Sequence, residues 1–280
     1  MKTDLPTSNT IAFLGGGWLG FPSAVQLRQK GYVVKVSTTT ESKLAYFQSK
    51  SLVPYLLQLS PEVNNTNTVQ DFLNADTLVI NIPPGKASSL DFHPNQIKSL
   101  LPFIEKSSVS HIIYVSATSV YHEHNQEAFE NEVSNATAAN NQKLALAEDL
   151  LKAIPNKHIT ILRYGGLVGG TRNLLKFFEG KMNVEGGNVP VNLIHQKDAV
   201  NILCETITQQ LYDDTFNVCT PLHPTKKEFY TALATRFNAI PPQFLLNDQA
   251  PFKIVNAEKI VKALDYKFEF EDPLTFEYDN

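Results

Sequence analysis

A glycine-rich stretch near the N-terminus constrains the fold of this chain more than any other feature. A short apolar run, Ile11 to Leu14, ends in glycines, and a helix-compatible segment from Phe21 to Lys30 follows. That segment stops at Gly31, and a run rich in β-branched residues, 32–36, takes over. A strand, a tight turn, a helix and a second strand in this order are typical of the opening βαβ unit of a dinucleotide-binding fold.

The glycines of this turn match the spacing G-x-G-x-x-G at Gly15, Gly17 and Gly20. Gly15 would allow the turn, Gly17 would let a pyrophosphate reach backbone N–H groups, and Gly20 would let the helix pack on the strand. The positive end of the helix dipole would face the phosphates, with Trp18 and Leu19 beside them. Glycine triplets also occur in ordinary turns, but the position between two strand-like runs favours a dinucleotide site.

The next part of the chain continues to alternate between strand and helix patterns. We expect further strands at 54–59, 77–82, 111–115 and 159–162, and helices at 41–49, 92–105 and 141–154. Such alternation predicts an α/β fold, a Rossmann-type doubly wound parallel sheet with helices on both faces.

The alternation breaks after Tyr164, where glycine pairs mark an irregular region. A strand-like segment at 192–194 and a helix at 198–208 predict a return to the sheet, and helical segments at 226–237 and 256–264 follow. We therefore expect residues 1–165, joined by 190–220, to form an NAD(P)-binding Rossmann domain. Residues 166–189 and 221–280 are expected to form a smaller C-terminal lobe that covers the strand ends and binds the substrate.

The composition excludes several classes of protein. The 280 residues are 42% hydrophobic and 19% charged, with a net charge of −4 and no strong attraction to nucleic acid. No apolar run approaches the ~20 residues that span a bilayer. Only Cys204 and Cys219 are present, which excludes a disulfide scaffold and favours a reducing compartment. We expect a soluble cytoplasmic protein that acts on a small molecule, without nucleic-acid or membrane partners; a homodimer is compatible with the sequence.

Several stretches in fixed order carry a family resemblance. They include Gly16 to Gly20, Thr118-Ser119-Val120-Tyr121, Phe177 to Lys181, and His223-Pro224-Thr225. With them the chain resembles the extended short-chain dehydrogenase/reductase superfamily, specifically its NAD(P)-dependent epimerase/dehydratase branch. Within that branch it is most similar to the atypical bacterial subgroup often called YeeZ-like, and the likeness spans nearly the whole chain.

The resemblance implies a hydride-transfer site. In the family a Tyr acts as general acid or base, a Lys four residues later lowers its pKa and holds the nicotinamide ribose, and a Ser or Thr after the fifth strand fixes the substrate oxygen. Here Ala139 stands four residues before Lys143, and Ala117 stands at the hydroxyl position. Only Lys143 remains, as a ribose ligand or as a solvated helix lysine.

Neighbouring hydroxyls could substitute for the missing groups. Ser116, Thr118 and Tyr121 lie in the same loop, and Tyr121 is the best replacement acid on chemical grounds. In relatives, however, a Tyr at that position commonly lines the pocket without catalysing. The catalytic candidates are therefore Lys143, Tyr121 and Thr118.

The second strand points to the type of nicotinamide nucleotide. NAD sites usually place an acid at its end to hydrogen-bond the ribose 2′-hydroxyl. This sequence instead reads Ser37-Thr38-Thr39-Thr40, with Lys43 just beyond Glu41, which would accommodate a 2′-phosphate. We expect NADP in preference to NAD. The other expected cofactor contacts are Thr38, Thr39, Pro83, Pro84, Ser116, Lys143 and Tyr164.

The substrate side rests on three residues that the resemblance implies. Arg172 is expected to hold a phosphate or carboxylate, or else to form a surface ion pair. Asn192 and His195 match a family segment along the pocket wall, although His195 fits a satisfied core histidine equally well. Asp198 fits a helix cap or a fold-stabilising acid better than a catalyst. His122 and His124 begin an acidic loop, and no metal site is expected.

Two functions of different classes follow. The first is an NAD(P)-dependent oxidoreductase or epimerase/dehydratase acting on a small polar substrate such as a nucleotide sugar, which the substrate lobe favours. The second is a catalytically silent NAD(P)-binding or sensor protein, which the two alanines favour. A β-hydroxyacid dehydrogenase fits less well, because those enzymes carry a long all-helical C-terminal domain, whereas this chain predicts strands at 159–162 and 192–194.

Overall fold

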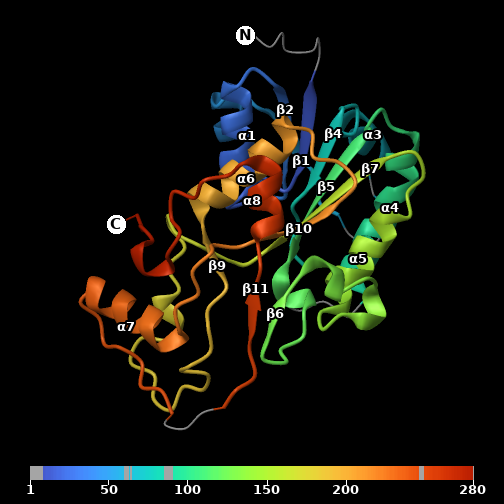
Figure 1. The fold of residues 1–280 in the computed structure, drawn as a ribbon. Coiled ribbons are helices and arrows are strands. Elements are labelled where there is room, and N and C mark those ends of the chain that lie inside the picture. The colour runs from blue at the N-terminus through green and yellow to red at the C-terminus, as the bar shows by residue number, and fades with distance from the viewer. Residues whose placement is uncertain (1–8, 60–62, 64, 85–90, 246–248, 280) are drawn as a thin grey trace. The chain divides into compact units, whose positions relative to one another are not determined.

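The computed structural model of the chain describes residues 9–59, 63, 65–84, 91–245 and 249–279 (Figure 1). The chain divides into two compact units. Unit 1 lies within residues 1–116, 135–162 and 203–215, and unit 2 within residues 117–134, 163–202 and 216–280. Residues 117–134 were expected in the larger domain and belong to unit 2. The substrate-binding role of the smaller lobe stays a prediction.

A central sheet of seven strands has the order β10-β7-β5-β4-β1-β2-β3. Its strands are β1 (Thr10–Leu14), β2 (Val33–Thr38), β3 (Val53–Leu56), β4 (Thr77–Ile80), β5 (His111–Ala117), β7 (His158–Tyr164) and β10 (Thr215–Val218). The pairs β1–β2, β1–β4, β2–β3 and β4–β5 are parallel. The strand order reverses between β1 and β4, where doubly wound sheets bind ligands beyond the carboxyl ends of the strands.

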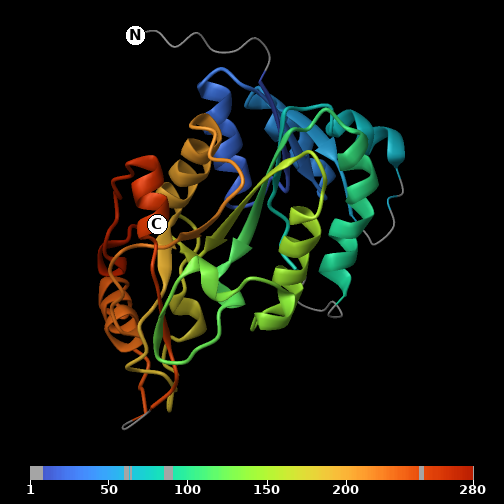
Figure 2. The same ribbon diagram turned by 45° about the vertical axis from the view of Figure 1, so that its right-hand side comes forward.

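Helices of unit 1 cover both faces of the sheet. α1 (Gly20–Gln29) lies on one face, and α4 (Phe92–Lys106) and α5 (Gln142–Lys152) lie on the other (Figures 1 and 2). The shorter helices α2 (Leu44–Ser49) and α3 (Thr66–Phe72) follow β2 and β3. β1 and β4 are buried almost throughout, as expected of strands covered on both faces. The predicted α/β, Rossmann-type doubly wound sheet is confirmed.

The predicted return of residues 190–220 to the sheet is only partly correct. β9 (Leu193–His195) pairs in parallel with β8 (Gly166–Val168), and these two form a separate sheet. The strand that joins the edge of the central sheet is β10, which the sequence did not predict. The helix between them is α6 (Gln196–Thr208), close to its expected bounds.

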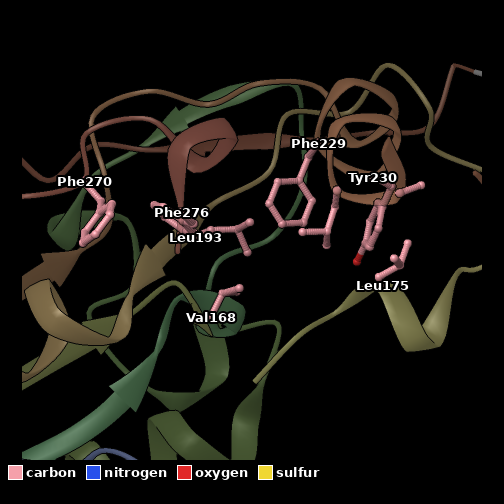
Figure 3. Packing of buried hydrophobic residues seen from close by; sticks show 9 residues of the cluster. Val168, Leu175, Leu193, Phe229, Tyr230, Phe270 and Phe276 are labelled. Carbon is pink, nitrogen blue, oxygen red and sulfur yellow. The ribbon is translucent and has the colours of Figure 1, made fainter. Parts of the chain in front are cut away.

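Unit 2 has a hydrophobic core of its own (Figure 3). Aromatic and aliphatic side chains from β8, β9, the short 3₁₀ helix Leu175–Phe177, α7 (Lys226–Arg236) and the C-terminal segment gather there: Val168, Leu175, Leu193, Phe229, Tyr230, Leu233, Ala234, Phe270 and Phe276. Each fully buried Phe or Leu contributes roughly 1.5–3 kcal/mol. α7 begins at Lys226 because Thr225 and Glu228 form a capping box, in which each side chain accepts a hydrogen bond from the other residue's backbone N–H.

Unit 2 also contains two short paired strands and a further helix. β6 (Gln126–Ala128) pairs in parallel with β11 (Lys253–Val255), and α8 (Glu258–Leu264) follows β11. In the part of the chain that the structure describes, no helix combines the length and apolarity needed to cross a bilayer.

Candidate functional site

A cavity of about 410 Å³ opens at the carboxyl ends of the strands in unit 1. Its walls are the glycine turn after β1, the segments that follow β2, β3 and β4, and the first turns of α4. The residues that line it are Leu14, Gly15, Gly16, Gly17, Ser37, Thr38, Thr39, Thr40, Lys43, Leu57, Gln58, Leu59, Asn81, Ile82, Pro83, Phe92 and Gln96.

Two glycines of the turn are required by close packing. Gly15 has φ +109°, in the left-handed region, and an added Cβ would lie 2.4 Å from the Asn81 carbonyl oxygen. At Gly20 an added Cβ would lie 2.2 Å from the Gly15 carbonyl oxygen. The turn therefore has room for neither side chain, in agreement with the roles expected for the first and third glycines.

Gly17 is different, because an added Cβ would meet no atom within 4 Å. The residue is exposed and lines the cavity, so its backbone can be approached closely by a ligand. α1 begins three residues later without a side-chain cap, which leaves the positive end of the helix dipole without a protein partner of that kind. The turn can therefore receive an anionic group.

Hydrogen bonds from β2 and β4 hold the turn in place. The Gly15 N–H donates to Ser37 Oγ at 2.9 Å, and the Gly16 N–H donates to the Ser37 carbonyl oxygen at 2.7 Å. Asn81 Nδ2 donates to the Gly15 carbonyl oxygen at 3.2 Å. Sequence reasoning missed Asn81, whose only signal is a polar residue at the end of a buried apolar strand.

The segment after β2 presents hydroxyls and one cation to the cavity. Thr38 Oγ1 accepts the Thr40 N–H at 3.1 Å, which fixes the bend that exposes Thr39 and Thr40. Lys43 also lines the cavity and is exposed. No carboxylate occurs among the described lining residues. This wall is therefore suited to an anionic ligand group.

Of the other residues expected to contact the cofactor, some line the cavity and some do not. Pro83 lines the cavity, whereas Pro84 is not among the residues that do. Leu19 is buried and Trp18 half-buried, and neither lines the cavity. Ser116 is buried, and its hydroxyl donates to Glu148 Oε1 at 2.6 Å. For these residues cofactor contact stays a prediction.

Lys143 lies in the first turn of α5 and is half-buried. The helix begins there because the Asn141 side chain accepts the Leu144 N–H. Ala139, where the family carries its Tyr, is buried and precedes this helix. The electrostatic influence of Lys143 reaches His93 on α4, so the two side chains lie on neighbouring helices of unit 1.

In unit 2, Tyr121 belongs to a buried hydrogen-bonded cluster. Its side chain is 0% exposed, and its hydroxyl donates to Asn217 Oδ1 at 2.6 Å and accepts from Arg163 Nη1 at 2.9 Å. Arg163 also donates to the carbonyl oxygens of Glu130 and Val133. This geometry fits an architectural role. Sequence reasoning missed Arg163 and Asn217, although a charged residue inside an apolar strand was a visible signal.

Thr118 lies in the short 3₁₀ turn after β5 and is buried. Tyr164, predicted to contact the cofactor, is buried and donates its hydroxyl proton to the Ala199 carbonyl oxygen at 3.1 Å. Its hydroxyl therefore ties β7 to α6 within unit 2.

Two of the expected substrate residues, Asn192 and Arg172, differ in how exposed they are. Asn192 donates to the Lys253 carbonyl oxygen at 2.9 Å and accepts the Val255 N–H at 2.8 Å, so its amide is bound to β11. Arg172 is exposed, and its backbone pairs with Gly169 in an isolated bridge. Substrate contact by these residues stays a prediction.

His195 is a satisfied core histidine, the alternative that the sequence left open. Its Nε2 donates to the Glu277 carbonyl oxygen at 3.0 Å, and its Nδ1 accepts the Lys197 N–H at 3.3 Å. The ring lies 3.9 Å from the Phe270 ring, centroid to centroid, and burial lowers the pKa of His195.

Asp198 is buried in the first turn of α6 and acts as a fold-stabilising acid, not as a helix cap, because its partners lie outside this helix. Its carboxylate accepts the Tyr266 hydroxyl at 2.8 Å, the Glu269 N–H at 2.9 Å and the Phe270 N–H at 3.0 Å. The Asp198 carboxylate thus hydrogen-bonds the C-terminal segment to the start of α6. No group of three or more potential metal ligands comes together among the residues described.

Unit 2 also has a cavity of about 390 Å³ between β11, α8 and the segments around residues 219–223 and 266–271. Its floor includes Cys219 and Val255, and His223 lies in its wall. None of the expected substrate residues, Arg172, Asn192 and His195, lines this cavity.

Comparison of the structure with solved structures shows the fold. The UDP-glucose 4-epimerase of Stenotrophomonas maltophila covers 96% of each chain with a TM-score of 0.77 and 16% identity. The UDP-N-acetylglucosamine 4-epimerase of Bacillus cereus covers 95% of this chain and 97% of its own, with a TM-score of 0.74 and 18% identity. A short-chain dehydrogenase/reductase superfamily protein of Agrobacterium tumefaciens covers 95% and 94%, with a TM-score of 0.73 and 14% identity.

Comparison of the sequence shows the family. No family model matches the chain. The chain is 30% identical over 267 residues to protein YeeZ of Escherichia coli K12, which is 94% of this chain and 97% of that protein. The chain therefore belongs to the YeeZ family, and its fold is that of the extended short-chain dehydrogenases/reductases and epimerases.

Proposed function

We propose that this protein binds NADP in the cavity of unit 1 and acts as an NAD(P)-dependent oxidoreductase or epimerase/dehydratase on a small polar substrate such as a nucleotide sugar. The observation that carries the proposal is the glycine turn, in which Gly15 and Gly20 are packed shut while Gly17 is open to the cavity. A ligand that approaches the backbone closely accounts for a glycine at Gly17, because packing within the protein does not require one there.

The residues present fit the phosphate groups of a dinucleotide. The uncapped start of α1 and the bare Gly17 backbone would hold the pyrophosphate. Thr39, Thr40 and Lys43 would hold a 2′-phosphate, and no described lining carboxylate would repel it. The S. maltophila epimerase has NAD bound, and a Bacillus cereus UDP-glucuronic acid 4-epimerase is in complex with UDP-glucuronic acid and NAD, which supports a dinucleotide here.

The proposed chemistry uses few protein groups. The nicotinamide would supply hydride transfer. Lys143 would hold the ribose, as in the family. The Thr118 hydroxyl makes no hydrogen bond with the described part of the chain, so it can donate one to a substrate oxygen. Tyr121 was the stronger candidate from the sequence. We now assign it the lesser role, because its hydroxyl is held by Asn217 and Arg163.

Isothermal titration calorimetry tests the cofactor assignment. We expect NADPH to bind at least tenfold more tightly than NADH, about 1.4 kcal/mol, because a charge-assisted contact to the 2′-phosphate is lost with NADH. NADH binding as tightly as NADPH would remove the NADP preference. Binding of neither nucleotide, reduced or oxidised, would refute the whole proposal.

A turnover assay distinguishes an enzyme from a catalytically silent NAD(P)-binding protein. The second alternative is favoured by Ala117 and Ala139. The protein with NADP⁺ or NAD⁺ is incubated with UDP-glucose, UDP-glucuronic acid and UDP-N-acetylglucosamine, and products are read by chromatography. For an active enzyme we expect Thr118→Val to lower kcat at least tenfold with unchanged NADPH affinity, and Ser119→Ala, its exposed neighbour, to change neither. NADPH binding without any product would favour the silent binder.

A further inference from the structure

A buried hydrogen-bonded group in unit 1 lies next to the walls of the cavity described above. His93, near the start of α4, and Tyr114, in the middle of β5, are both 0% exposed. His93 Nε2 lies 2.7 Å from the Tyr114 hydroxyl oxygen, and His93 Nδ1 lies 3.4 Å from Gln96 Oε1. Gln96 Nε2 donates to the Leu59 carbonyl oxygen at 2.6 Å. We call Tyr114, His93, Gln96 and Leu59 the α4–β5 relay.

The bond to Leu59 sets the direction of every other bond in the relay. A carbonyl oxygen only accepts, so the Gln96 side chain must direct its NH₂ to Leu59 and its Oε1 to His93. An Oε1 facing Nδ1 requires the proton of the neutral imidazole to be on Nδ1. His93 Nε2 is then an acceptor, and the Tyr114 O–H donates to it. The relay therefore needs a neutral His93.

The surroundings keep His93 in that state. Burial lowers the pKa of His93 and is the largest effect. The hydrogen bond with Gln96 opposes it in part, and the positive charge of Lys143 on α5 adds a smaller lowering. Burial also raises the pKa of Tyr114, helped by the Glu148 carboxylate on α5. The titratable and charged groups named here come from β5 and α5. Of these, the Lys143 cation, together with burial, disfavours a second proton on the imidazole.

One end of the relay reaches the cavity. Leu59 and Gln96 both line it, and so does Phe92, the residue before His93. The relay therefore connects two walls of the cavity, the segment after β3 and the first turns of α4, to strand β5 of the central sheet. Breaking it would leave buried polar atoms without partners, so this part of the cavity wall would no longer be held in place.

We propose that His93 is a positioning residue for the dinucleotide, holding the Leu59–Gln96 wall of the cavity through the proton that Tyr114 donates to it. The inference rests on the function proposed above, because it takes the ligand of this cavity to be NADP or NAD. His93 itself does not line the cavity, so it acts through Gln96.

The test compares His93→Phe with a matched control. His111→Phe removes another buried histidine from unit 1, one that bonds Thr160 and lines neither cavity. Calorimetry with NADPH and NADH at pH 7.5 should show at least tenfold weaker binding for His93→Phe. Binding should stay within twofold for His111→Phe even where both lose similar stability. Equal affinity of wild type and His93→Phe would overturn the inference.

A pH profile adds a readout that a merely structural role would not move. Protonated His93 cannot accept from Tyr114, and burial lowers its pKa below the ordinary imidazole value of about 6.5. NADH affinity of the wild type should therefore hold at neutral pH and fall only as the pH is lowered below about 6.5. His93→Phe should lack that component, and the ratio of its Kd to that of the wild type should shrink. A constant ratio would contradict the relay.

Hydrogen exchange separates this inference from the proposed function. Without any nucleotide, His93→Phe should accelerate amide exchange in residues 56–59 and 92–96, whereas His111→Phe should not. Unchanged exchange would refute the relay as a support of the wall. If the wild type binds no nucleotide, the proposed function fails, and the assignment of His93 to a dinucleotide fails with it.

Discussion

Gly17→Ala is expected to change the stability of the protein and its affinity for NADPH in opposite directions. Gly17 lacks a left-handed backbone conformation, and an added Cβ would touch nothing within 4 Å. At such a position, alanine restricts the unfolded chain and stabilises the native state by roughly 0.4–1 kcal/mol. We therefore expect the free energy of unfolding, measured by urea denaturation, to rise by about 0.5 kcal/mol.

The same methyl group would stand in the path of the pyrophosphate. Loss of close approach to the backbone should raise the Kd for NADPH at least tenfold, which is about 1.4 kcal/mol. Gain of stability together with loss of affinity is unusual for one substitution. It is the combination expected only where a glycine serves a ligand and not the fold.

Gly20→Ala is the matched comparison. Its Cβ would lie 2.2 Å from the Gly15 carbonyl oxygen and 2.8 Å from Asn81 Nδ2, so backbone must move. Overpacking of this kind costs about 1–3 kcal/mol. We expect lower stability as well as lost binding. An unchanged NADPH affinity in Gly17→Ala would show that no nucleotide lies against the turn, and a destabilisation above about 1 kcal/mol would refute the packing argument.

Three further outcomes follow from single side chains. Lys43→Glu should weaken NADPH binding at least tenfold in calorimetry while NADH affinity changes less than threefold, because Lys43 lines the cavity beside Thr40; an equal loss for both nucleotides would contradict a 2′-phosphate contact. Asp198→Asn should lower the free energy of unfolding by about 2 kcal/mol in urea, because the carboxylate accepts three hydrogen bonds; a change below about 0.5 kcal/mol would refute its role in holding the C-terminal segment. Burial, together with His158, lowers the pKa of His111 to about 3, so the unfolded chain binds this proton more readily and stability falls as the pH drops from about 6.5 towards 3. The slope is about 1.4 kcal/mol per pH unit, and in urea titrations His111→Phe should lack that contribution.

The parts of the fold that could be predicted are those whose signal is local. Strands buried on both faces, such as β1 and β4, read as uninterrupted apolar runs. β10 escaped prediction because it is short and carries Asn217 in its interior. The Asn217 amide bonds the carbonyl oxygens of Ala128 and Asn256, distant partners that no local pattern reveals.

The candidate site also has parts that the sequence predicts and parts that it does not. The glycine motif was readable because each glycine meets a geometric need within one βαβ unit, and the structure bears out the packing of Gly15 and Gly20. The role of Tyr121 was not readable, because its hydroxyl is bound by Arg163 and Asn217, 42 and 96 residues away. The sequence shows which chemistry a side chain is capable of. It does not show whether residues far along the chain already hydrogen-bond that side chain.

These existing hydrogen bonds also decide which side chains can contact a substrate. Recruiting a buried, hydrogen-bonded side chain to a ligand means breaking its existing bonds, at about 1–3 kcal/mol for each polar atom left behind. Tyr121, Asn192 and His195 are all bound in this way within unit 2. Thr118 carries no such cost. Any turnover by this protein should therefore depend on the Thr118 hydroxyl more steeply than on Tyr121, the reverse of the ranking that acid strength alone suggests.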